Sequence, residues 1–243
     1  MEDNRIALVT GANKGIGLEI ARQLAQAGVK VIVGARDAGR AATAVQALRA
    51  QGLAAQAVMI DLNDHGSITA AAQAIEAQHG RLDILVNNAG VVDAADGPPS
   101  TSSAEAVCRI MQTNFIGTLT VTQAMLPLLR RSPAARIVNL SSSLGSLTLN
   151  GDPASPYYEA RLIGYNASKA AVNMLTVQLA QELRGTAIAV NSVSPGYVKT
   201  DLTGHAGHMT PEEGARLPVR YALLPEGEAV SGAFVEPGGT TPW

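Results

Sequence analysis

The sequence holds a single cysteine, Cys108, which excludes an internal disulfide and suits a reducing compartment. Cys108 falls in a helical pattern without a nearby histidine, so we expect a buried structural thiol rather than a nucleophile. The histidines are few and scattered, at His65, His79, His205 and His208. No His/Cys cluster has the spacing of a metal site, so we expect no bound metal.

An excess of positive charge and a long apolar run are also lacking. Lysine and arginine number 18 against 20 aspartates and glutamates, so no basic surface indicates a nucleic acid or an anionic membrane. No uninterrupted apolar stretch reaches the roughly 18 to 20 residues needed to cross a bilayer. The acidic start, MEDNR, does not resemble a signal peptide. These features favour a cytoplasmic protein with neither a membrane nor a nucleic acid as partner.

Apolar residues, by contrast, are plentiful at 47% of the 243 residues, enough to bury a full core. Short apolar runs predict strands at 5–10, 29–35, 54–62, 82–90, 136–142, 188–196 and 231–239. Helical patterns lie between and after them at 15–28, 38–52, 64–80, 102–131, 166–185 and 211–224. The runs are continuous rather than alternating, which indicates a parallel sheet buried on both faces. We predict an α/β chain with one doubly wound (Rossmann) domain over residues 1–243, a mostly parallel sheet of about seven strands and helices on both faces.

A glycine-rich turn, TGANKGIG, joins the first predicted strand to the first predicted helix. Gly11, Gly15 and Gly17 suit a turn without room for Cβ atoms, and the helix N-terminus offers free N–H groups to a pyrophosphate. After the first strand of a doubly wound sheet, this pattern indicates a dinucleotide site. No Lys-Ser/Thr pair follows the last glycine, so the turn is not a Walker-type loop.

The end of the second predicted strand distinguishes between NAD(H) and NADP(H) as the dinucleotide. NAD sites usually place an acid there to hold the ribose 2′-hydroxyl. Here the strand ends at Ala35 and Arg36, and Lys14 lies in the glycine-rich turn. Two cations and no acid favour the 2′-phosphate of NADP(H). Asp37 comes next, and we expect it to cap the following helix.

Polar residues also follow the third and fourth predicted strands. Asp61 suits either a bond from an adenine amino group or a cap for the helix after Leu62. In the NNAG motif, Gly90 lets a ligand approach the backbone, and Asn88 can bond a ribose or the main chain. We expect Asn87 to form a structural bridge between strands.

Aromatic residues are scarce, at 3% of the chain, yet three of the five tyrosines lie together at Tyr157, Tyr158 and Tyr165. Tyr165 and Lys169 are four positions apart at the start of a predicted helix, so they share a face one turn apart. A phenol has a pKa near ~10, and a nearby ammonium lowers that pKa. A shift of about three units takes roughly 4 kcal/mol of differential stabilisation. The pair therefore favours Tyr165 as a general acid.

Seven motifs occur in order along nearly the whole chain: TGANKGIG, DL at Asp61, NNAG, TNFIGT, IVNLSS, YNASK and SPGYVKTDL. On these motifs the chain resembles the classical short-chain dehydrogenase/reductase family. NKGIG, ARD and the later pattern EEGARLPVRYALLP make it most like the NADPH-dependent carbonyl reductases. The resemblance implies an enzyme that uses NADP(H) and acts on a small-molecule carbonyl or alcohol.

The resemblance also implies roles for individual residues. Tyr165 matches the family's acid/base, and Lys169 matches the lysine that lowers the tyrosine pKa and binds the nicotinamide ribose. Ser142, the middle one of three consecutive serines, best matches the serine that binds the substrate carbonyl. Asn114 matches the asparagine that holds a water in the proton relay. Pro195, Gly196, Val198 and Thr200 match the loop beside the nicotinamide carboxamide. The residues expected at the cofactor are Gly11, Asn13, Lys14, Gly15, Ile16, Gly17, Arg36, Asp61, Leu62, Asn88, Ala89, Gly90, Tyr165, Lys169, Pro195, Gly196, Val198 and Thr200.

Two segments are expected to govern the substrate side. The connection from Ser142 to Tyr165 is longer than in the commonest family members, and its extra length falls in the loop 144–163. We expect this loop, with Tyr157 and Tyr158, to line or close the substrate pocket and to weaken tetramer formation, which favours a monomer or dimer. Residues 197–215 are expected to form a mobile lid over the substrate.

The predicted function is the reversible NADPH-dependent reduction of ketones or aldehydes to alcohols, with hydride transfer to the carbonyl carbon and Tyr165 as general acid. Two alternatives remain open. The first is a 3-oxoacyl-carrier reductase, which the lack of a basic patch for an acidic carrier disfavours. The second is a dinucleotide-sensing regulator without turnover, which the joint presence of Tyr165, Lys169, Ser142 and Asn114 disfavours.

Overall fold

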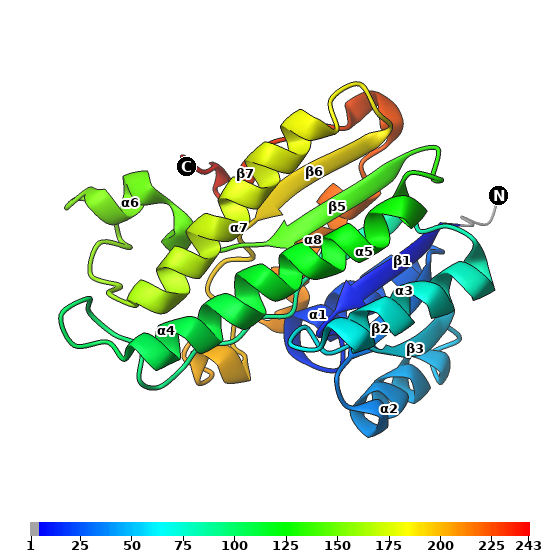
Figure 1. Ribbon diagram of the computed structural model, residues 1–243, viewed down its shortest axis with the longest axis horizontal. Coiled ribbons are helices and arrows are strands. Elements are labelled where there is room, and N and C mark those ends of the chain that lie inside the picture. Colours follow the sequence, from blue (N-terminus) through cyan, green and yellow to red (C-terminus); the bar gives the residue numbers. More distant parts are fainter. Residues whose placement is uncertain (1–4) are drawn as a thin grey trace.

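The continuous apolar runs of the sequence form the strands of one sheet in the computed structural model, which describes residues 5–243 (Figure 1). The strand order is β3-β2-β1-β4-β5-β6-β7-β8, and only the β7–β8 pair is antiparallel. The strands are β1 (Ile6–Thr10), β2 (Lys30–Ala35), β3 (Ala55–Met59), β4 (Ile84–Asn87), β5 (Ala135–Leu140), β6 (Ile188–Val193), β7 (Phe234–Glu236) and β8 (Gly239–Thr240). The run predicted as one last strand is split by a turn at Pro237 and Gly238, because proline cannot donate to a ladder.

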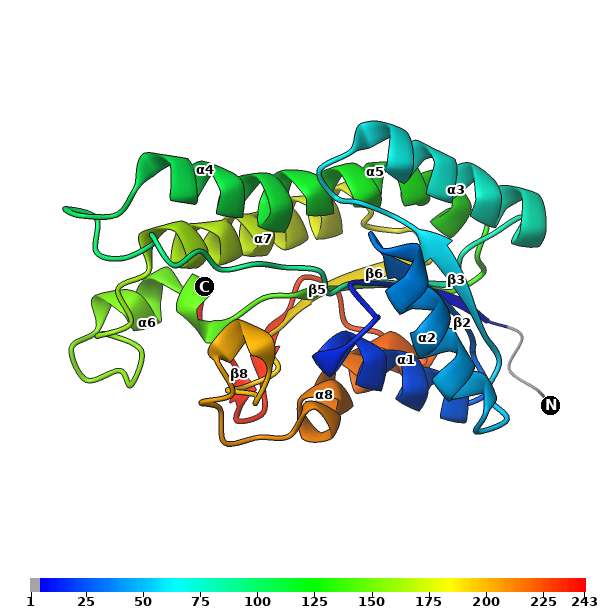
Figure 2. The same cartoon turned by 90° about the horizontal axis from the view of Figure 1, so that it is seen from below.

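Helices cover both faces of the sheet, with α1, α2 and α8 on one side and α3, α4, α5 and α7 on the other (Figure 2). Their bounds are α1 (Gly15–Gln26), α2 (Ala38–Arg49), α3 (His65–His79), α4 (Ala104–Met111), α5 (Thr118–Leu129), α6 (Leu147–Gly151), α7 (Ile163–Glu182) and α8 (Pro211–Leu223). The predicted doubly wound α/β domain is therefore confirmed. No helix within residues 5–243 is long and apolar enough to span a bilayer.

Strand β1 shows why the strand sequences are unbroken apolar runs. Ala7 and Val9 pack into the core under α1, α2 and α8, whereas Ile6 and Leu8 pack into the core under α3, α5 and α7. Successive side chains of a strand point to opposite faces of the sheet, so a strand between two helix layers needs apolar residues at every position.

The helix predicted at 102–131 is divided into three parts. Between α4 and α5, residues Gln112–Gly117 form a π-helical turn. The prediction of a buried Cys108 is wrong, because this thiol is exposed. Ala106 and Ile110 form the buried face of α4, and Cys108 lies two positions from each of them, which turns it to the opposite side of the helix.

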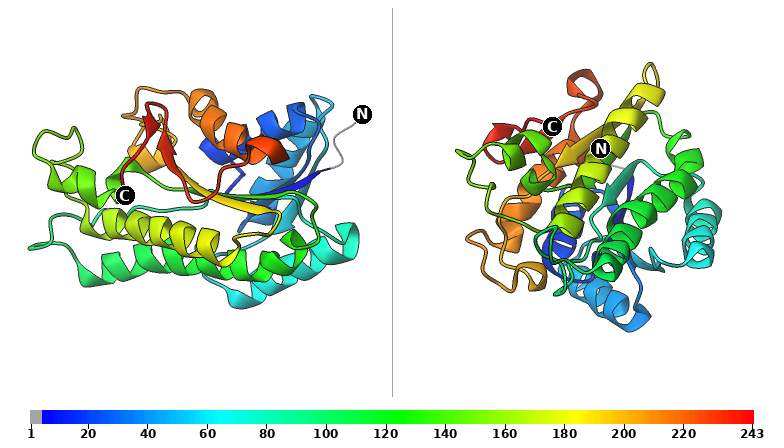
Figure 3. Two further views of the ribbon diagram at one scale, coloured as in Figure 1. Left: turned by 90° about the horizontal axis from the view of Figure 1, so that it is seen from above. Right: turned by 60° about the vertical axis from the view of Figure 1, so that its left-hand side comes forward.

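The two segments expected on the substrate side are partly regular. The loop 144–163 contains α6 and several turns, and it projects from the same end of the molecule as the loop before α4 (Figure 3). Residues 197–215 include a bridge between Val198 and Met209, a 3₁₀ turn at Asp201–Thr203 and the start of α8. Both segments begin after the carboxyl end of a parallel strand.

Candidate active site

The glycine-rich turn leads from β1 into α1, which begins at Gly15. A Cβ at Gly17 would clash with the Asn88 amide nitrogen and lie 2.6 Å from the Gly11 carbonyl oxygen. Asn88 Nδ2 itself donates to the carbonyl oxygens of Thr10 (2.9 Å) and Gly11 (3.3 Å), which ties the end of β4 to this turn. The Lys14 side chain does not cap α1, so the first N–H groups of the helix can bind an anion.

The cations predicted for a 2′-phosphate occupy different surroundings. Arg36 is exposed directly after β2, and its side chain has no partner within residues 5–243. Lys14 forms an ion pair with Asp201, a contact that the sequence did not predict. His205 Nε2 lies 3.0 Å from the same carboxylate. Asp37 caps α2 as predicted, because its side chain accepts a hydrogen bond from the Arg40 N–H at 2.8 Å.

The structure tests the helix cap considered for Asp61 and the bridge between strands expected from Asn87. Asp64, not Asp61, caps α3, and it accepts a hydrogen bond from the Gly66 N–H at 2.8 Å. Of the two alternatives for Asp61, the helix cap is therefore wrong, since its carboxylate instead accepts from the Asn63 N–H at 3.0 Å. Asn87 does bridge strands, because its Nδ2 donates to Asn139 Oδ1 of β5 at 2.8 Å.

Three consecutive serines follow β5, and each has a different partner. Ser141 Oγ donates to Asn173 Oδ1 at 2.6 Å, inside the core. Ser143 Oγ donates to Glu236 Oε2 of β7 at 2.5 Å. Only Ser142 hydrogen-bonds the side chain of Tyr165. The structure thus brings together the Ser142 and Tyr165 hydroxyls.

Lys169 lies under the ring of Tyr165 rather than beside its hydroxyl. Its Nζ is 5.6 Å from the ring centroid and donates to the Leu140 carbonyl oxygen at 2.7 Å. Burial lowers the pKa of Lys169 to about 8. Burial also raises the pKa of Tyr165 to about 12, although the hydrogen bond with Ser142 opposes the change. The expected lowering of the tyrosine pKa is therefore wrong for this structure, because desolvation disfavours the phenolate.

Asn114 sits in the π-helical turn, fully buried. Its Nδ2 donates to the Val91 carbonyl oxygen (2.9 Å) and to Ser168 Oγ (3.0 Å), and its Oδ1 accepts from the Val91 N–H (2.7 Å). A Cβ built on Gly90 would lie 3.5 Å from Asn114 Oδ1 and 3.7 Å from Lys169 Nζ. The loop after β4 and the start of α7 therefore meet at Asn114, and π-turns often mark such functional sites.

The loop after β6 closes the opposite side of the site. A Cβ built on Gly15 would lie 3.6 Å from the Thr200 methyl group, so this loop contacts the glycine-rich turn. Val198 is buried, while Pro195 and Gly196 are partly exposed. The predicted cofactor residues thus follow five parallel strands at one edge of the sheet, where ligands bind in doubly wound folds.

Sequence reasoning missed two acids near this edge. Asp96 accepts hydrogen bonds from the N–H groups of Gly164 (2.8 Å) and Tyr165 (2.9 Å) at the start of α7. Glu236 accepts from Tyr157 Oη at 2.9 Å as well as from Ser143, and so holds the loop 144–163 to the end of β7. One available signal was the sequence around the start of α7, ARLIG, which holds no usual N-cap residue.

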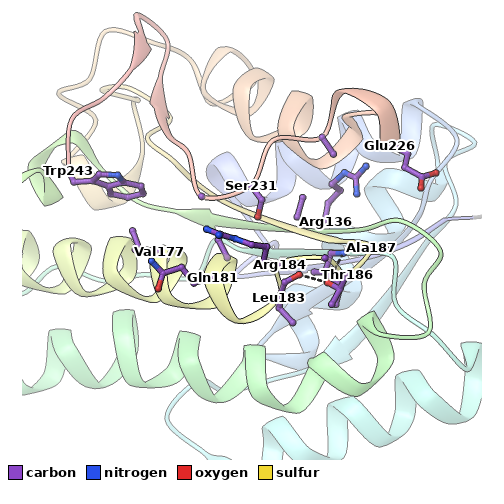
Figure 4. A pocket seen from close by; sticks show the side chains of 16 residues that line it. Arg136, Val177, Gln181, Leu183, Arg184, Thr186, Ala187, Glu226, Ser231 and Trp243 are labelled. Atoms are coloured by element: carbon purple, nitrogen blue, oxygen red, sulfur yellow. Dashed lines mark hydrogen bonds between the residues drawn. The ribbon is translucent and has the colours of Figure 1, made fainter.

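A crevice of about 560 Å³ lies elsewhere, between the C-terminal half of α7 and the segment before β7 (Figure 4). Arg136, Arg184 and Glu226 line it, and Trp243 stands at one end. The Arg136 guanidinium already donates to the carbonyl oxygens of Leu224 (3.0 Å) and Ala135 (2.9 Å). Neither Ser142 nor Tyr165 contributes to this crevice, so it is separate from the candidate site.

Comparisons with known proteins agree with the fold. Residues 5–210 match the model of the family described as short chain dehydrogenase. The chain is 36% identical over 276 residues to Carbonyl reductase [NADPH] 1 of Mus musculus, covering 98% of each chain. It is 35% identical over 286 residues to (+)-neomenthol dehydrogenase of Arabidopsis thaliana, covering 96% of each. Salutaridine reductase from Papaver somniferum superposes with a TM-score of 0.82 at 32% identity, over 95% of this chain and 99% of that one. The chain therefore belongs to the short-chain dehydrogenase/reductase family of oxidoreductases, and it is most like the carbonyl reductases.

Proposed function

We propose that the chain reduces ketones or aldehydes to alcohols with NADPH, and that the same groups serve the reverse oxidation. The observation that carries this proposal is the contact of the half-buried Tyr165 side chain with Ser142, above the Lys169 ammonium. Two hydroxyl donors that converge in a desolvated site can bind one carbonyl oxygen and stabilise the negative charge that develops on it.

Tyr165 would supply the proton in the direction of reduction. Its pKa of about 12 keeps the phenol neutral at pH 7, which is the state that can donate. Ser142 would hold the carbonyl oxygen in place beside it. Lys169, under the Tyr165 ring, and Asn114, which bonds Ser168 of the same helix, would return the proton through a water.

NADP(H) fits the residues at this edge of the sheet, and it would supply the hydride. The start of α1 has no side-chain cap, so its first N–H groups are available to a pyrophosphate. Arg36, exposed and without a side-chain partner within residues 5–243, would bind the 2′-phosphate at the end of β2. The NADPH in the name of the Mus musculus relative supports the same choice. Asp61 would face the adenine, and Lys169 the nicotinamide ribose.

The test is consumption of NADPH with a panel of ketones and aldehydes. We expect Tyr165→Phe to lower kcat by about 100- to 10,000-fold, the usual contribution of a general acid. Tyr221→Phe is the matched control, since Tyr221 lies near the end of α8, outside the loop 144–163 and the proposed lid, and should leave kcat within about twofold. Arg36→Ala should weaken binding of NADPH but not of NADH. Binding of NADPH without consumption across the panel would refute the proposal.

The remaining assignments concern the surroundings of the site. We propose that residues 197–215 form the substrate lid and that the loop 144–163 shapes the pocket, with Tyr157 anchored by Glu236. We also propose a cytoplasmic location. We further propose a monomer or dimer, because the long loop 144–163 adjoins α7 and is expected to weaken tetramer formation. Light scattering that gave a tetramer would contradict this assembly.

A further inference from the structure

The start of α7 has no cap of its own. Leu162 occupies the N-cap position, and it has no side-chain oxygen that could accept from the first N–H groups. This matters because the third residue of α7 is Tyr165, so any fraying of the first turn would move the proposed acid.

A distant dipeptide supplies the missing acceptors. The Gly97 carbonyl oxygen accepts from the Ile163 N–H at 3.0 Å. The two oxygens of Asp96 accept separately from the next two N–H groups, Oδ1 from Gly164 at 2.8 Å and Oδ2 from Tyr165 at 2.9 Å. The carboxylate also meets the positive end of the helix dipole, which strengthens such bonds.

The surroundings of Asp96 are built for this contact. Asp96 Oδ1 also accepts from its neighbour Gly97 N–H (2.9 Å) and from Ser102 Oγ (3.1 Å), so the carboxylate is held at one orientation. A Cβ built on Gly164 would lie 3.1 Å from Asp96 Oδ1 and 3.0 Å from Ile110 Cδ1. A larger residue at 164 would therefore require the carboxylate or Ile110 to shift.

We propose that Asp96 is a positioning residue. It holds the Tyr165 hydroxyl in the position needed for proton donation, and it connects the loop after β4 to α7. The proposal rests on the proposed role of Tyr165. Asp96 touches neither substrate nor cofactor in this scheme, and it acts through the backbone of the first turn of α7.

The experiment compares Asp96→Asn, Asp96→Ala and Gly164→Ala with the wild type. The control is Asp93→Asn, since Asp93 lies in the same loop but bonds the Ala95 N–H and Arg109 rather than α7. We expect kcat to fall about tenfold in Asp96→Asn, which keeps one acceptor, and further in Asp96→Ala. The dissociation constant of NADPH, measured by fluorescence, should stay within about twofold, and Asp93→Asn should match the wild type.

A purely structural role would give a different result. If both Asp96 variants lost thermal stability but kept kcat within twofold at 25 °C, the proposal would be overturned. Hydrogen exchange of the segment 163–169 gives a readout that does not need turnover. Faster exchange confined to this segment in Asp96→Ala supports the contact even if no carbonyl is reduced, and unchanged exchange there overturns it.

Discussion

Replacing Lys169 with methionine should change how the stability of the protein depends on pH. Burial lowers the pKa of Lys169 to about 8 in the folded chain, whereas an unfolded lysine has a pKa near ~10.4. Between these two values the unfolded chain binds more protons than the folded chain, so the free energy of unfolding rises with pH. Below pH 8 both states are protonated, and the folded state carries the full cost of the buried ammonium.

The size of the effect follows from the lowered pKa. Each pH unit above the folded pKa adds about 1.4 kcal/mol, so the wild type should gain about 2 kcal/mol between pH 7 and pH 9.5. Lys169→Met lacks the titrating group and should not show this gain. Measurements should stop below pH 10. In the folded chain Tyr165 keeps its proton up to a pKa of about 12, whereas an unfolded tyrosine loses it near ~10, so the free energy of unfolding falls as pH rises above about 10.

Urea unfolding without nucleotide at pH 7.0, 8.0, 9.0 and 9.5 measures the effect. The difference in unfolding free energy between wild type and Lys169→Met cancels every group that titrates in both proteins. Lys30→Met, at the exposed first position of β2, serves as the control and should follow the wild type. A difference that changed by less than about 0.5 kcal/mol over this range would refute the burial argument.

Three further predictions test other contacts. Gly17→Ala places a Cβ against Asn88 and should weaken NADPH binding by at least about tenfold in a fluorescence titration; binding within twofold of the wild type would contradict it. Tyr157→Phe removes the 2.9 Å hydrogen bond to Glu236 and should lower the free energy of unfolding in urea by about 1.5 to 3 kcal/mol; an unchanged value would count against that contact. Cys108 should react with a thiol reagent in the native protein, and Cys108→Ser should abolish the reaction without changing stability by more than about 0.5 kcal/mol; a native protein inert to the reagent would disprove its exposure.

Features that depend on local sequence were predictable. The strand-to-helix turn at Gly11–Gly17, the cap at Asp37 and the shared helical face of Tyr165 and Lys169 each need only a few neighbouring residues. Strand β1 was predictable for a related reason, because burial on both faces leaves an unbroken apolar run.

Features that depend on contacts between distant parts of the chain could not be predicted from the sequence. Asp96 and the Tyr165 N–H are 69 positions apart, and Glu236 and Ser143 are 93 apart, so no local pattern relates them. The prediction of a lowered pKa for Tyr165 was wrong for the same reason. Spacing indicated a lysine one turn away, but the depth of burial, which decides the direction of the shift, is a property of the whole fold.

The long connection between Ser142 and Tyr165 has a consequence for how such an enzyme can change. The Ser142 hydroxyl follows the end of β5 and the Tyr165 hydroxyl belongs to the first turn of α7, whose first N–H groups bond Asp96 and Gly97, outside this connection. Because the entropic cost of closing a loop grows only with the logarithm of its length, doubling this loop costs about 0.6 kcal/mol. Residues can therefore be added or exchanged between β5 and α7 to suit a new molecule, while the proposed proton donor and Ser142 keep their places.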